Sequence, residues 1–370
     1  MSQYEDLFKD IGNDPDISEV VKQKVRDDKT KAQQRARIKI LQQELENERR
    51  AREVLLNIKT EPPKINFRIP KPKRKSRKNT AVTGSMFSDI HCDEIIEPHE
   101  VNGRNEHTPE ICEQKFKRYC EGVVALVEKE QTFYNIDTHI FWIGGDLLTG
   151  HIHDELVEVT AMAPPETIVW LYPRLKAIIQ YLAENRKVKR LIIPWSFGNH
   201  GRDGKKPRIS KAAVHNFEFI LAKLLEEEIK KEPWGKKVHM IIEPSYLNYV
   251  DLECSNGKIF KIACHHGDGL SGGGGAGGLA GPVTRAINGW NKHIYADLYI
   301  GGHYHQIVEG RNFYQNGSLI GHSPYAIKIR AAPEPPQQGF FVIDTDRAQK
   351  VSSSIIHVLP KEDLERFGWI

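Results

Sequence analysis

The sequence predicts an α/β fold in which two sheets pack face to face with helices outside them (an α/β/β/α sandwich), preceded by an N-terminal helical arm. Strand-like and helix-like segments alternate between residues 79 and 242, which is typical of parallel strands joined by crossover helices. After residue 305 the segments are short strands without helices. Residues 16–58 are rich in Lys, Arg, Gln, Glu, Ala and Leu and contain no Gly or Pro, as helices do. Two sheets that each cover an apolar face leave the helices on the outside.

Length and composition bound the organisation of the chain. At 370 residues it exceeds the usual size of one domain, and its 39% hydrophobic residues suffice for a core, although the mean hydropathy is −0.51. We divide it into an acidic start and charged helical arm (1–60), a Pro-containing basic linker (61–78), an α/β domain (79–345), and a C-terminal strand and tail (346–370).

The sequence favours a cytoplasmic protein over a membrane-bound or secreted one. No apolar run approaches the roughly 18–20 residues that a membrane-spanning helix needs. The start Met-Ser-Gln-Tyr-Glu-Asp lacks the basic and apolar segments of a secretory signal. The five cysteines are odd in number, widely spread and without a Cys-x-x-Cys pair, as expected of reduced thiols.

The arm and the linker are much more basic than the rest of the chain. Residues 1–78 carry 21 Lys and Arg against 13 Asp and Glu, a net charge of +8, whereas the remainder has −4. The run Lys71–Lys78 can lie against phosphates and release counterions, which gives salt-sensitive, sequence-independent binding. The apolar residues of the arm form a broken stripe, so no regular coiled coil is expected. Three interpretations stay open: a nucleic-acid contact, a homo-oligomerising element and a solvated helix.

The elements of the α/β domain follow from its apolar patterns. Apolar runs predict strands at residues 81–87, 138–143, 188–193 and 238–242, and periodic patterns predict helices at 109–130, 164–185 and 210–231. Asn256-Gly257 separates two further runs, 246–252 and 258–264, and predicts a hairpin. The last predicted strands form a mostly antiparallel sheet and lie at 306–309, 313–320, 325–329 and 339–343.

Polar side chains follow five of the predicted strand ends. They are Asp89 and His91, Asp146, Asn199 and His200, His266, and the pair His303 and His305. Because open α/β folds bind ligands outside the carboxyl ends of their parallel strands, we expect these loops to meet. Carboxylate, imidazole and carboxamide groups without a thiolate indicate a site for Mn, Fe or Zn rather than a sulfur-rich structural zinc site. The number of candidate ligands is too large for one tetrahedral ion and suits two ions that share a carboxylate.

Written with their neighbours, the motifs are Asp89-Ile90-His91, Gly145-Asp146, Gly198-Asn199-His200, His266-Gly267 and Gly302-His303-Tyr304-His305, followed by Asn316-Gly317-Ser318. In this order they resemble the calcineurin-like metallophosphoesterase superfamily across residues 79–345. Each motif alone is weak, whereas five in order are specific. The chain is also similar to phage-encoded members that share Gly-Asn-His-Gly-Arg and to the double-strand-break repair nuclease branch, so a bacterial or phage-infected cell is the expected setting.

The resemblance implies a role for each residue. It implies one ion held by Asp89, His91 and His305, a second held by Asn199, His266 and His303, and Asp146 as the bridge between them. A hydroxide between the ions would attack phosphorus. His200 would face the phosphate and stabilise charge or protonate the leaving oxygen, a task that suits an imidazole near neutral pH. Mn²⁺ is the ion we expect first, with Zn²⁺, Fe, Ni²⁺ and Mg²⁺ as alternatives.

Departures from the family pattern leave some neighbours unassigned. Gly201 stands where many relatives carry Asp or Glu, so the partner that orients His200 is open between Asp203 and a backbone carbonyl. Arg202 is a candidate contact to the substrate phosphate or a cap of its loop. His153 is a candidate lining residue of the substrate cleft.

Two further stretches bear on function. Residues 147–150 lack the Val-Asp-Arg-Gly element of serine/threonine protein phosphatases, which argues against that branch. The glycine-dense stretch Gly272–Gly281 is open between a lid, a backbone surface for phosphate and an ordinary loop.

We therefore expect a metal-dependent phosphoesterase, a hydrolase that cuts phosphodiesters of nucleic acid and meets that partner through its basic arm. A small-molecule phosphatase or nucleotide phosphodiesterase is the first alternative. A module that binds DNA without cutting it is the second.

Overall fold

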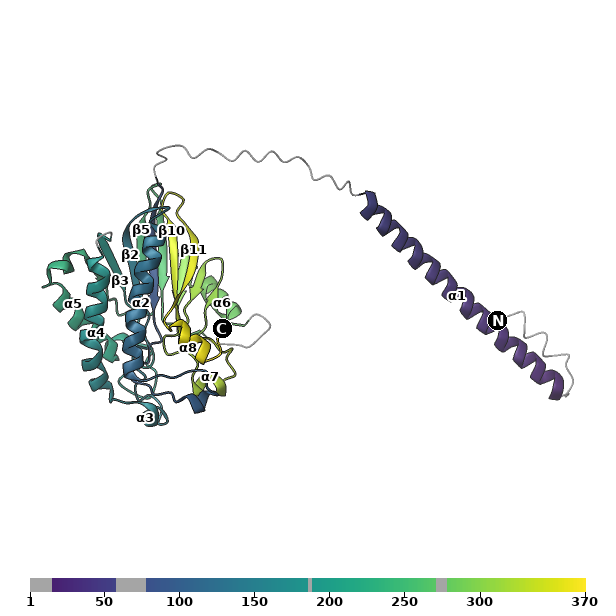
Figure 1. Ribbon diagram of the computed structural model, residues 1–370, viewed down its shortest axis with the longest axis horizontal. Coiled ribbons are helices and arrows are strands. Elements are labelled where there is room, and N and C mark those ends of the chain that lie inside the picture. Colours follow the sequence, from purple (N-terminus) through teal and green to yellow (C-terminus); the bar gives the residue numbers. More distant parts are fainter. Residues whose placement is uncertain (1–14, 58–77, 186–187, 271–277) are drawn as a thin grey trace. The chain divides into compact units, whose positions relative to one another are not determined.

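The computed structural model describes residues 15–57, 78–185, 188–270 and 278–370. The chain divides into two compact units, residues 1–76 and 77–370. The first contains α1 (Pro15–Asn57), a single helix whose described side chains are all exposed. The second contains both sheets and the remaining helices (Figure 1). Within the described ranges, every helix is too short or too polar to cross a membrane.

The first sheet of the second unit has a parallel half and an antiparallel half. Its order is β11-β10-β1-β2-β3-β4. The parallel strands are β1 (Thr80–Phe87), β2 (Asn135–Ile143), β3 (Arg190–Pro194) and β4 (Val238–Ile241). Antiparallel to β1 runs β10 (Gln337–Asp344), and β11 (Gln349–His357) completes that edge. The predicted alternation of parallel strands and helices is confirmed.

The second sheet is mixed, so the expectation of a mostly antiparallel sheet is wrong. Its order is β5 (Asn248–Glu253), β6 (Ile259–Cys264), β7 (Leu298–Gly301), β9 (Phe313–Gln315) and β8 (Val308–Glu309). The hairpin of β5 and β6 is confirmed, but β6–β7 and β7–β9 are parallel. For β6 and β7 the reason is α6 (Ala280–Trp290), a helix that the sequence analysis missed, because a crossover helix brings the next strand back in the same direction. Between β7 and β9 the chain passes through β8, which runs antiparallel to β9.

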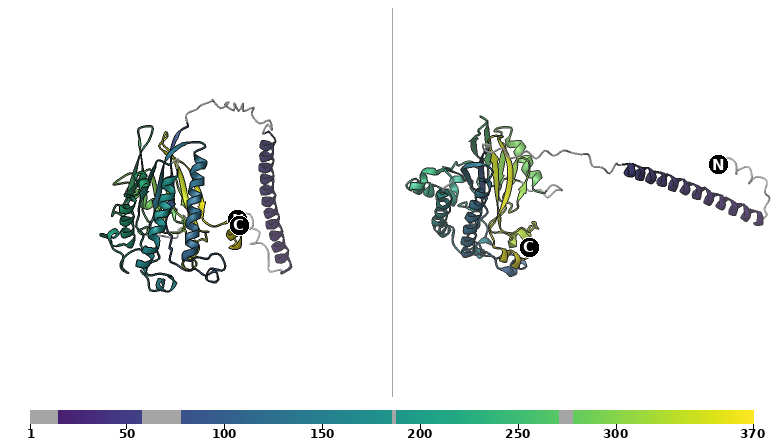
Figure 2. Two further views of the ribbon diagram at one scale, coloured as in Figure 1. Left: turned by 60° about the vertical axis from the view of Figure 1, so that its left-hand side comes forward. Right: turned by 45° about the horizontal axis from the view of Figure 1, so that its top comes forward.

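The layers run helices, first sheet, second sheet, helix, which confirms the predicted sandwich (Figures 1 and 2). One core lies between the first sheet and α2 (Pro109–Glu130), α4 (Pro164–Glu184) and α5 (Phe217–Ile229). A second core lies between the sheets, and a third lies under α6. In β2, Phe141 faces the helices whereas Ile140 and Trp142 face the other sheet. Successive strand residues point to opposite faces, so a strand covered on both sides reads as an unbroken apolar run.

Capping explains where several helices begin. The Thr108 hydroxyl accepts a hydrogen bond from Ile111 N at 3.3 Å, and α2 starts at the following proline. The predicted helix at 210–231 begins late, because Asn216 caps α5 after a 3₁₀ turn at Ala213–His215.

The predicted strand at 325–329 is instead a helix, α7 (Pro324–Lys328). The Ser323 hydroxyl accepts from Ala326 N at 3.3 Å, and Pro324 occupies the first helical position. This cap overrides the β-propensity of the Tyr and Ile residues that suggested a strand. The remaining short helices are α3 (Leu156–Val159), α8 (Lys361–Arg366), and 3₁₀ turns at Pro98–Val101 and Pro233–Lys237.

Candidate metal centre

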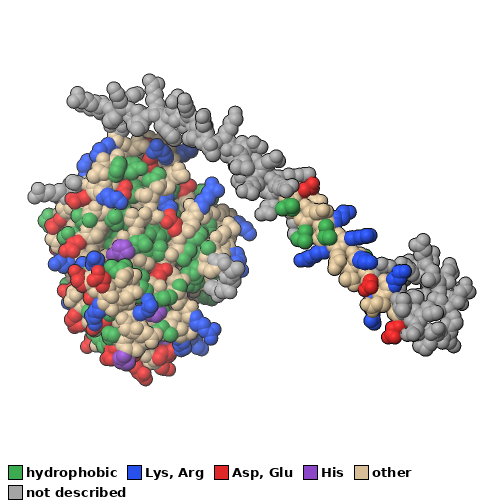
Figure 3. Space-filling model, turned by 45° about the vertical axis from the view of Figure 1, so that its right-hand side comes forward, with side chains coloured by type: hydrophobic (Ala, Val, Ile, Leu, Met, Phe, Trp, Pro, Cys, Tyr) green, Lys and Arg blue, Asp and Glu red, His purple; other side chains and the backbone are tan. Residues whose placement is uncertain are grey.

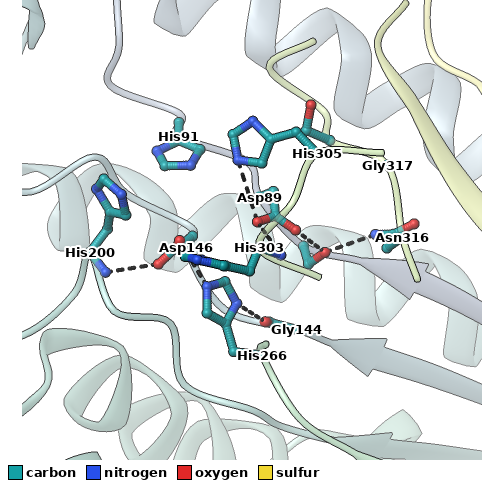
Figure 4. Close-up of polar contacts among 12 residues, drawn as sticks. Asp89, His91, Gly144, Asp146, His200, His266, His303, His305, Asn316 and Gly317 are labelled. Atoms are coloured by element: carbon teal, nitrogen blue, oxygen red, sulfur yellow. Dashed lines mark hydrogen bonds and ion pairs between the residues drawn. The ribbon is translucent and has the colours of Figure 1, made fainter. Parts of the chain in front are cut away.

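The five motifs meet at the carboxyl ends of β1, β2, β3, β6 and β7 (Figure 4). Three groups of side chains can each hold a metal ion, because the ligand atoms within each group lie within 4.8 Å of one another. They are Asp89, His91 and His305; His91, Asp146 and His200; and Asp146, His266 and His303. The eighth predicted residue, Asn199, joins the third group because its Oδ1 lies 3.2 Å from His266 Nε2. Every residue that the motifs singled out as a ligand is therefore in one cluster.

The backbone of the cluster adopts conformations that side chains rarely take. Asp89, His91, Asp146, His303 and His305 have φ values of 55°, 45°, 51°, 76° and 57°. Left-handed backbone is uncommon outside glycine and costs about 1–3 kcal/mol per residue when the surroundings enforce it. Such residues gather at functional sites, and here they coincide with the predicted ligands.

Glycine at position 198 allows two of these loops to touch. A Cβ there would lie 2.1 Å from Asp146 N and from Asp146 Oδ1. The same carboxylate oxygen accepts from His200 N at 2.8 Å. The Gly-Asn-His and Gly-Asp motifs are thus packed backbone to side chain, and no larger residue fits between them.

Around His266, three hydrogen-bond acceptors converge. Its Nδ1 donates to Gly144 O at 2.7 Å, and Nε2 lies 2.9 Å from Asp146 Oδ2 and 3.2 Å from Asn199 Oδ1, so a neutral ring would have no donor for these two oxygens. Acceptors without a donor repel one another unless a proton or a cation lies between them. Burial alone would lower the pKa of His266, but the Asp146 carboxylate raises it well above its usual range. The pocket therefore favours a positive charge at this point.

The neighbouring histidines show the opposite behaviour. Burial, followed by His200 and His305, lowers the pKa of His91 well below its usual range. Burial, followed by His266, lowers the pKa of His303 to about 4. Both rings are therefore neutral near pH 7 and offer lone pairs, as metal-ligating imidazoles do.

Two buried ring atoms support a metal ion directly. His91 Nε2 and His303 Nδ1 are buried and have no hydrogen-bond partner among the described residues. Buried polar atoms are rarely left unpaired, so each orphan needs an explanation. Nitrogen and oxygen donors without sulfur, aimed at shared points, fit first-row divalent ions. The residues present therefore fit the ions that the resemblance implies.

The orientation of His200 comes from the backbone of a neighbouring loop. His200 Nδ1 donates to Thr149 O at 2.7 Å, which settles the open choice in favour of a carbonyl. Asp203 instead bonds His215 at 2.7 Å. Buried Asp93 accepts from Thr149 N at 2.7 Å and fixes the loop. His200 Nε2 is left facing the cluster.

Glu218 at the start of α5 is a supporting residue that the sequence analysis missed. Its buried carboxylate accepts from Leu147 N at 2.8 Å and from Gly198 N at 3.0 Å. Asn216 donates from Nδ2 to Gly198 O at 2.7 Å. Helix α5 therefore holds both loops that carry Asp146 and Asn199.

Asp89 has a support of its own. Ser88 Oγ donates to its Oδ2, and Asn316 Nδ2 donates to Ser88 Oγ at 2.8 Å (Figure 4). The carboxylate also accepts from His303 N at 2.8 Å. The Asn-Gly-Ser motif thus acts on the cluster through one intervening hydroxyl.

A cleft of about 560 Å³ opens from the cluster and runs between α3 and α7. His153 lines it, and a contact of His153 with a substrate stays a prediction. Arg202 does not, since its guanidinium donates to the carbonyls of Asn199, Gly204 and Lys205 at 2.8–3.1 Å. Its contact with a substrate phosphate stays a prediction. The stretch Gly272–Gly281 lies largely outside the described residues, which omit 271–277.

Comparison with known proteins adds little to this geometry. No family model and no curated protein matches the sequence. Among solved structures, the chain is similar to a predicted phosphoesterase from Streptococcus pneumoniae (13% identity, TM-score 0.29, 75% of this chain and 97% of that one). It is also similar to a dimetal phosphatase from Danio rerio (9%, TM-score 0.30, 75% and 99%) and to vacuolar protein sorting 29 from Cryptosporidium parvum (13%, TM-score 0.27, 75% and 100%). At these TM-scores the similarity does not assign the activity or the site residues of those proteins to this chain.

Proposed function

We propose that the protein hydrolyses phosphate esters with two divalent metal ions, and that phosphodiesters of nucleic acid are its substrates. The observation that carries the proposal is the meeting of five strand-end motifs in one cluster, where His91 Nε2 and His303 Nδ1 are buried without a hydrogen-bond partner among the described residues. Asp89, His91 and His305 are the ligands of one ion. Asn199, His266 and His303 are those of the other, with Asp146 shared.

Two ions at such a site lower the pKa of bound water and offset the charge that develops on the phosphate. The chain supplies the remaining functions. Asp146 is held in place by His200 N, and Asp89 by Ser88 and His303 N. His200 keeps Nδ1–H on Thr149 O, so Nε2 can stabilise charge on the substrate or give a proton to the leaving oxygen.

The nucleic-acid part of the proposal rests on the arm. The described surface of α1 carries exposed cations along its length, namely Lys22, Lys24, Arg26, Lys29, Lys31, Arg35, Arg37 and Lys39 (Figure 3). Cations spaced along a helix suit a polyanion with regularly spaced phosphates. Mn²⁺ is the ion that we favour, because the donors are a mixture of carboxylates, imidazoles and an amide.

A nucleotide phosphodiesterase is the second candidate, and the cleft favours it. Its volume of about 560 Å³ falls within the range of small-molecule sites, about 300–1,000 Å³.

Metal add-back tests the proposal. Chelator-stripped protein receives Mn²⁺, Mg²⁺, Zn²⁺ or Ni²⁺ and is assayed on bis(p-nitrophenyl) phosphate, p-nitrophenyl phosphate and single-stranded DNA. We expect hydrolysis only with added metal, and the diesters as the better substrates. Failure to hydrolyse any ester with any ion would contradict the proposal.

Two variants separate the roles within the cluster. Asp146→Asn should lose activity together with both ions, measured by elemental analysis, whereas exposed Asp203→Asn should behave as wild type. His200→Ala should keep the ions and lose turnover by about 10²–10⁴-fold. Two ions at full occupancy in Asp146→Asn would rule out the bridge.

A further inference from the structure

The cleft that leaves the cluster changes character along its length. At the cluster it is lined by imidazoles and by the carboxylate of Asp146. Beyond them, between α3 and α7, apolar side chains form much of its wall. Figure 1 shows these two short helices at the same end of the second unit. We call this part the apolar end of the cleft; it is formed by Ile95, Leu156, Val159, Ile320, Tyr325 and Ile329.

The wall of the apolar end is fixed by buried hydrogen bonds. Asn105 Nδ2 donates to the carbonyls of Ile320 and His322 at 2.9 and 2.8 Å. On the α3 side, Ile95 N donates to Val159 O at 2.8 Å. Both walls are therefore formed before a ligand arrives, as in most small-molecule sites.

The charges around the apolar end exclude a second phosphate. The carboxylates that line the cleft are those of Glu94, Glu155 and Glu334, apart from the cluster itself. Lys328 is the cation of the described lining. A phosphate placed here would meet more like charge than opposite charge, and like charges brought together at a binding surface are costly. The group that enters is therefore not a second phosphate.

Tyr325 gives the apolar end a flat surface. It belongs to α7, lines the cleft and is 64% exposed. Exposed aromatic rings are the usual platforms for nucleic-acid bases, because every base has a π-face. The same chain places this ring in one continuous cavity with the cluster that is proposed to act on phosphorus.

We propose that the apolar end of the cleft binds the nucleoside of the phosphodiester, with its base stacked on Tyr325. The inference rests on the proposed function and narrows its substrate class to esters that carry an unpaired, uncharged nucleoside beside the reacting phosphate. A paired base inside a duplex presents no free face and does not enter a cavity of this size.

Two chromogenic esters test the proposal, since both release p-nitrophenol and differ only in the second arm. They are thymidine 5′-(p-nitrophenyl phosphate) and methyl p-nitrophenyl phosphate, assayed with the full-length, metal-loaded protein. Tyr325→Ala should lower kcat/KM for the nucleoside ester by about 5- to 150-fold, the range of one stacked base, and leave the methyl ester unchanged. Tyr325→Phe and Tyr325→Trp should restore the activity.

A matched control is Tyr295→Ala, because Tyr295 is also 64% exposed and lies outside the cleft lining. It should change neither ester. Equal losses on both esters, no loss on the nucleoside ester, or no rescue by Phe would overturn the stacking role.

Binding separates this inference from the proposed function. Thymidine 5′-monophosphate should bind wild type more tightly than methyl phosphate in calorimetry, and Tyr325→Ala should abolish the difference. If neither ester is hydrolysed but this difference is found, the proposed function fails and the nucleoside site stands. If hydrolysis occurs without the difference, the nucleoside site fails alone.

Discussion

Glu218 shows how a residue outside every motif can control the cluster. It lies 71 residues from Leu147, yet its carboxylate accepts hydrogen bonds from Leu147 N and Gly198 N, next to two predicted ligands. Burial, and then the Asp146 carboxylate, raise the pKa of Glu218 to about 7, while the two backbone donors oppose this shift. A buried acceptor that holds two loops is costly to alter, because its partners are left without a bond.

Glu218→Gln should therefore weaken both the fold and metal binding. The amide replaces one acceptor by a donor that faces a backbone N–H. We expect the free energy of unfolding to fall by about 1–3 kcal/mol and metal affinity to fall by about 10–100-fold. Urea unfolding and competition with a chelating dye measure the two effects.

Glu227→Gln is the control for this prediction. It makes the same chemical change on the same helix, at a side chain that is 67% exposed. It should alter neither quantity. Unchanged metal affinity in Glu218→Gln would show that α5 does not position the ligands.

The residues of the cluster were predictable from sequence, whereas the supporting residues Glu218 and Asn105 were not, for a physical reason. Asp89, His303 and the others follow strand ends, where local sequence fixes both their position and their chemistry. Glu218 occurs in an amphipathic helix among many other charged residues, and only the fold reveals that it is buried. The role of Asn105 could not be predicted either, because its hydrogen-bond partners lie more than two hundred residues away in the sequence.

The pairing of β1 and β2 contains a buried histidine that links stability to pH. His139 Nδ1 and Nε2 lie 2.9 Å from the hydroxyls of Thr83 and Ser85 on β1. Burial lowers the pKa of His139 to about 3. An unfolded histidine titrates near 6.5, so the unfolded chain takes up a proton first as the pH falls. The free energy of unfolding that depends on the neutral His139 ring is fully present above about pH 6.5 and is lost as the pH falls towards 3.

His139→Gln should reduce this acid sensitivity. Between pH 7 and pH 5 the histidine accounts for a loss of about 2 kcal/mol in the free energy of unfolding, which the variant should not show. Urea unfolding of metal-stripped protein at pH 7, 6 and 5 measures the slope. His99→Gln, at a side chain that is 76% exposed, should leave the slope unchanged. An equal slope in His139→Gln and wild type would contradict the buried neutral ring.

Long helices were predicted well from their periodicity, whereas short helices were predicted poorly. Helix α2 (Pro109–Glu130) matches the prediction to the residue, because its pattern spans several turns and Thr108 marks its start. Helix α7 was mistaken for a strand, since five residues are too few to show a period. The missed α6 explains why β6 and β7 are parallel.

At the scale of the whole molecule, the sandwich and the arm differ in what stabilises them. The sandwich buries three apolar cores, whereas the described side chains of α1 are all exposed. A helix in water gains little stability without a packed face. Its exposed apolar residues Ile38, Leu41 and Leu45 are spaced three and four residues apart and so form an apolar patch on one side of the helix. Figure 3 shows hydrophobic side chains beside Lys and Arg on the arm. We therefore propose that the arm binds a partner, and its charge favours a polyanion over a second copy.

Removing residues 1–76 should separate binding from catalysis. The cut falls at the boundary between the two units and spares Lys78, whose Nζ donates to Gln131 O at 2.8 Å. Hydrolysis of bis(p-nitrophenyl) phosphate should not change, because every residue of the cluster lies in the second unit. Affinity for DNA should become much less sensitive to salt, since each lost phosphate contact removes about 0.9 from the slope of log K against log salt.

A charge-only variant tells the polyanion from the second copy. The variant replaces four exposed cations by Gln and keeps the apolar patch; the four are Lys29, Lys31, Arg35 and Arg37. If the arm contacts phosphates, this variant should lose part of the salt sensitivity that the truncation removes, with the same number of chains per particle in light scattering as wild type. If the arm instead joins two copies, the variant should keep the wild-type slope, and only the truncation should halve the number of chains per particle. A full-length protein and a truncated protein with identical salt slopes and the same number of chains per particle would leave the basic arm without either role.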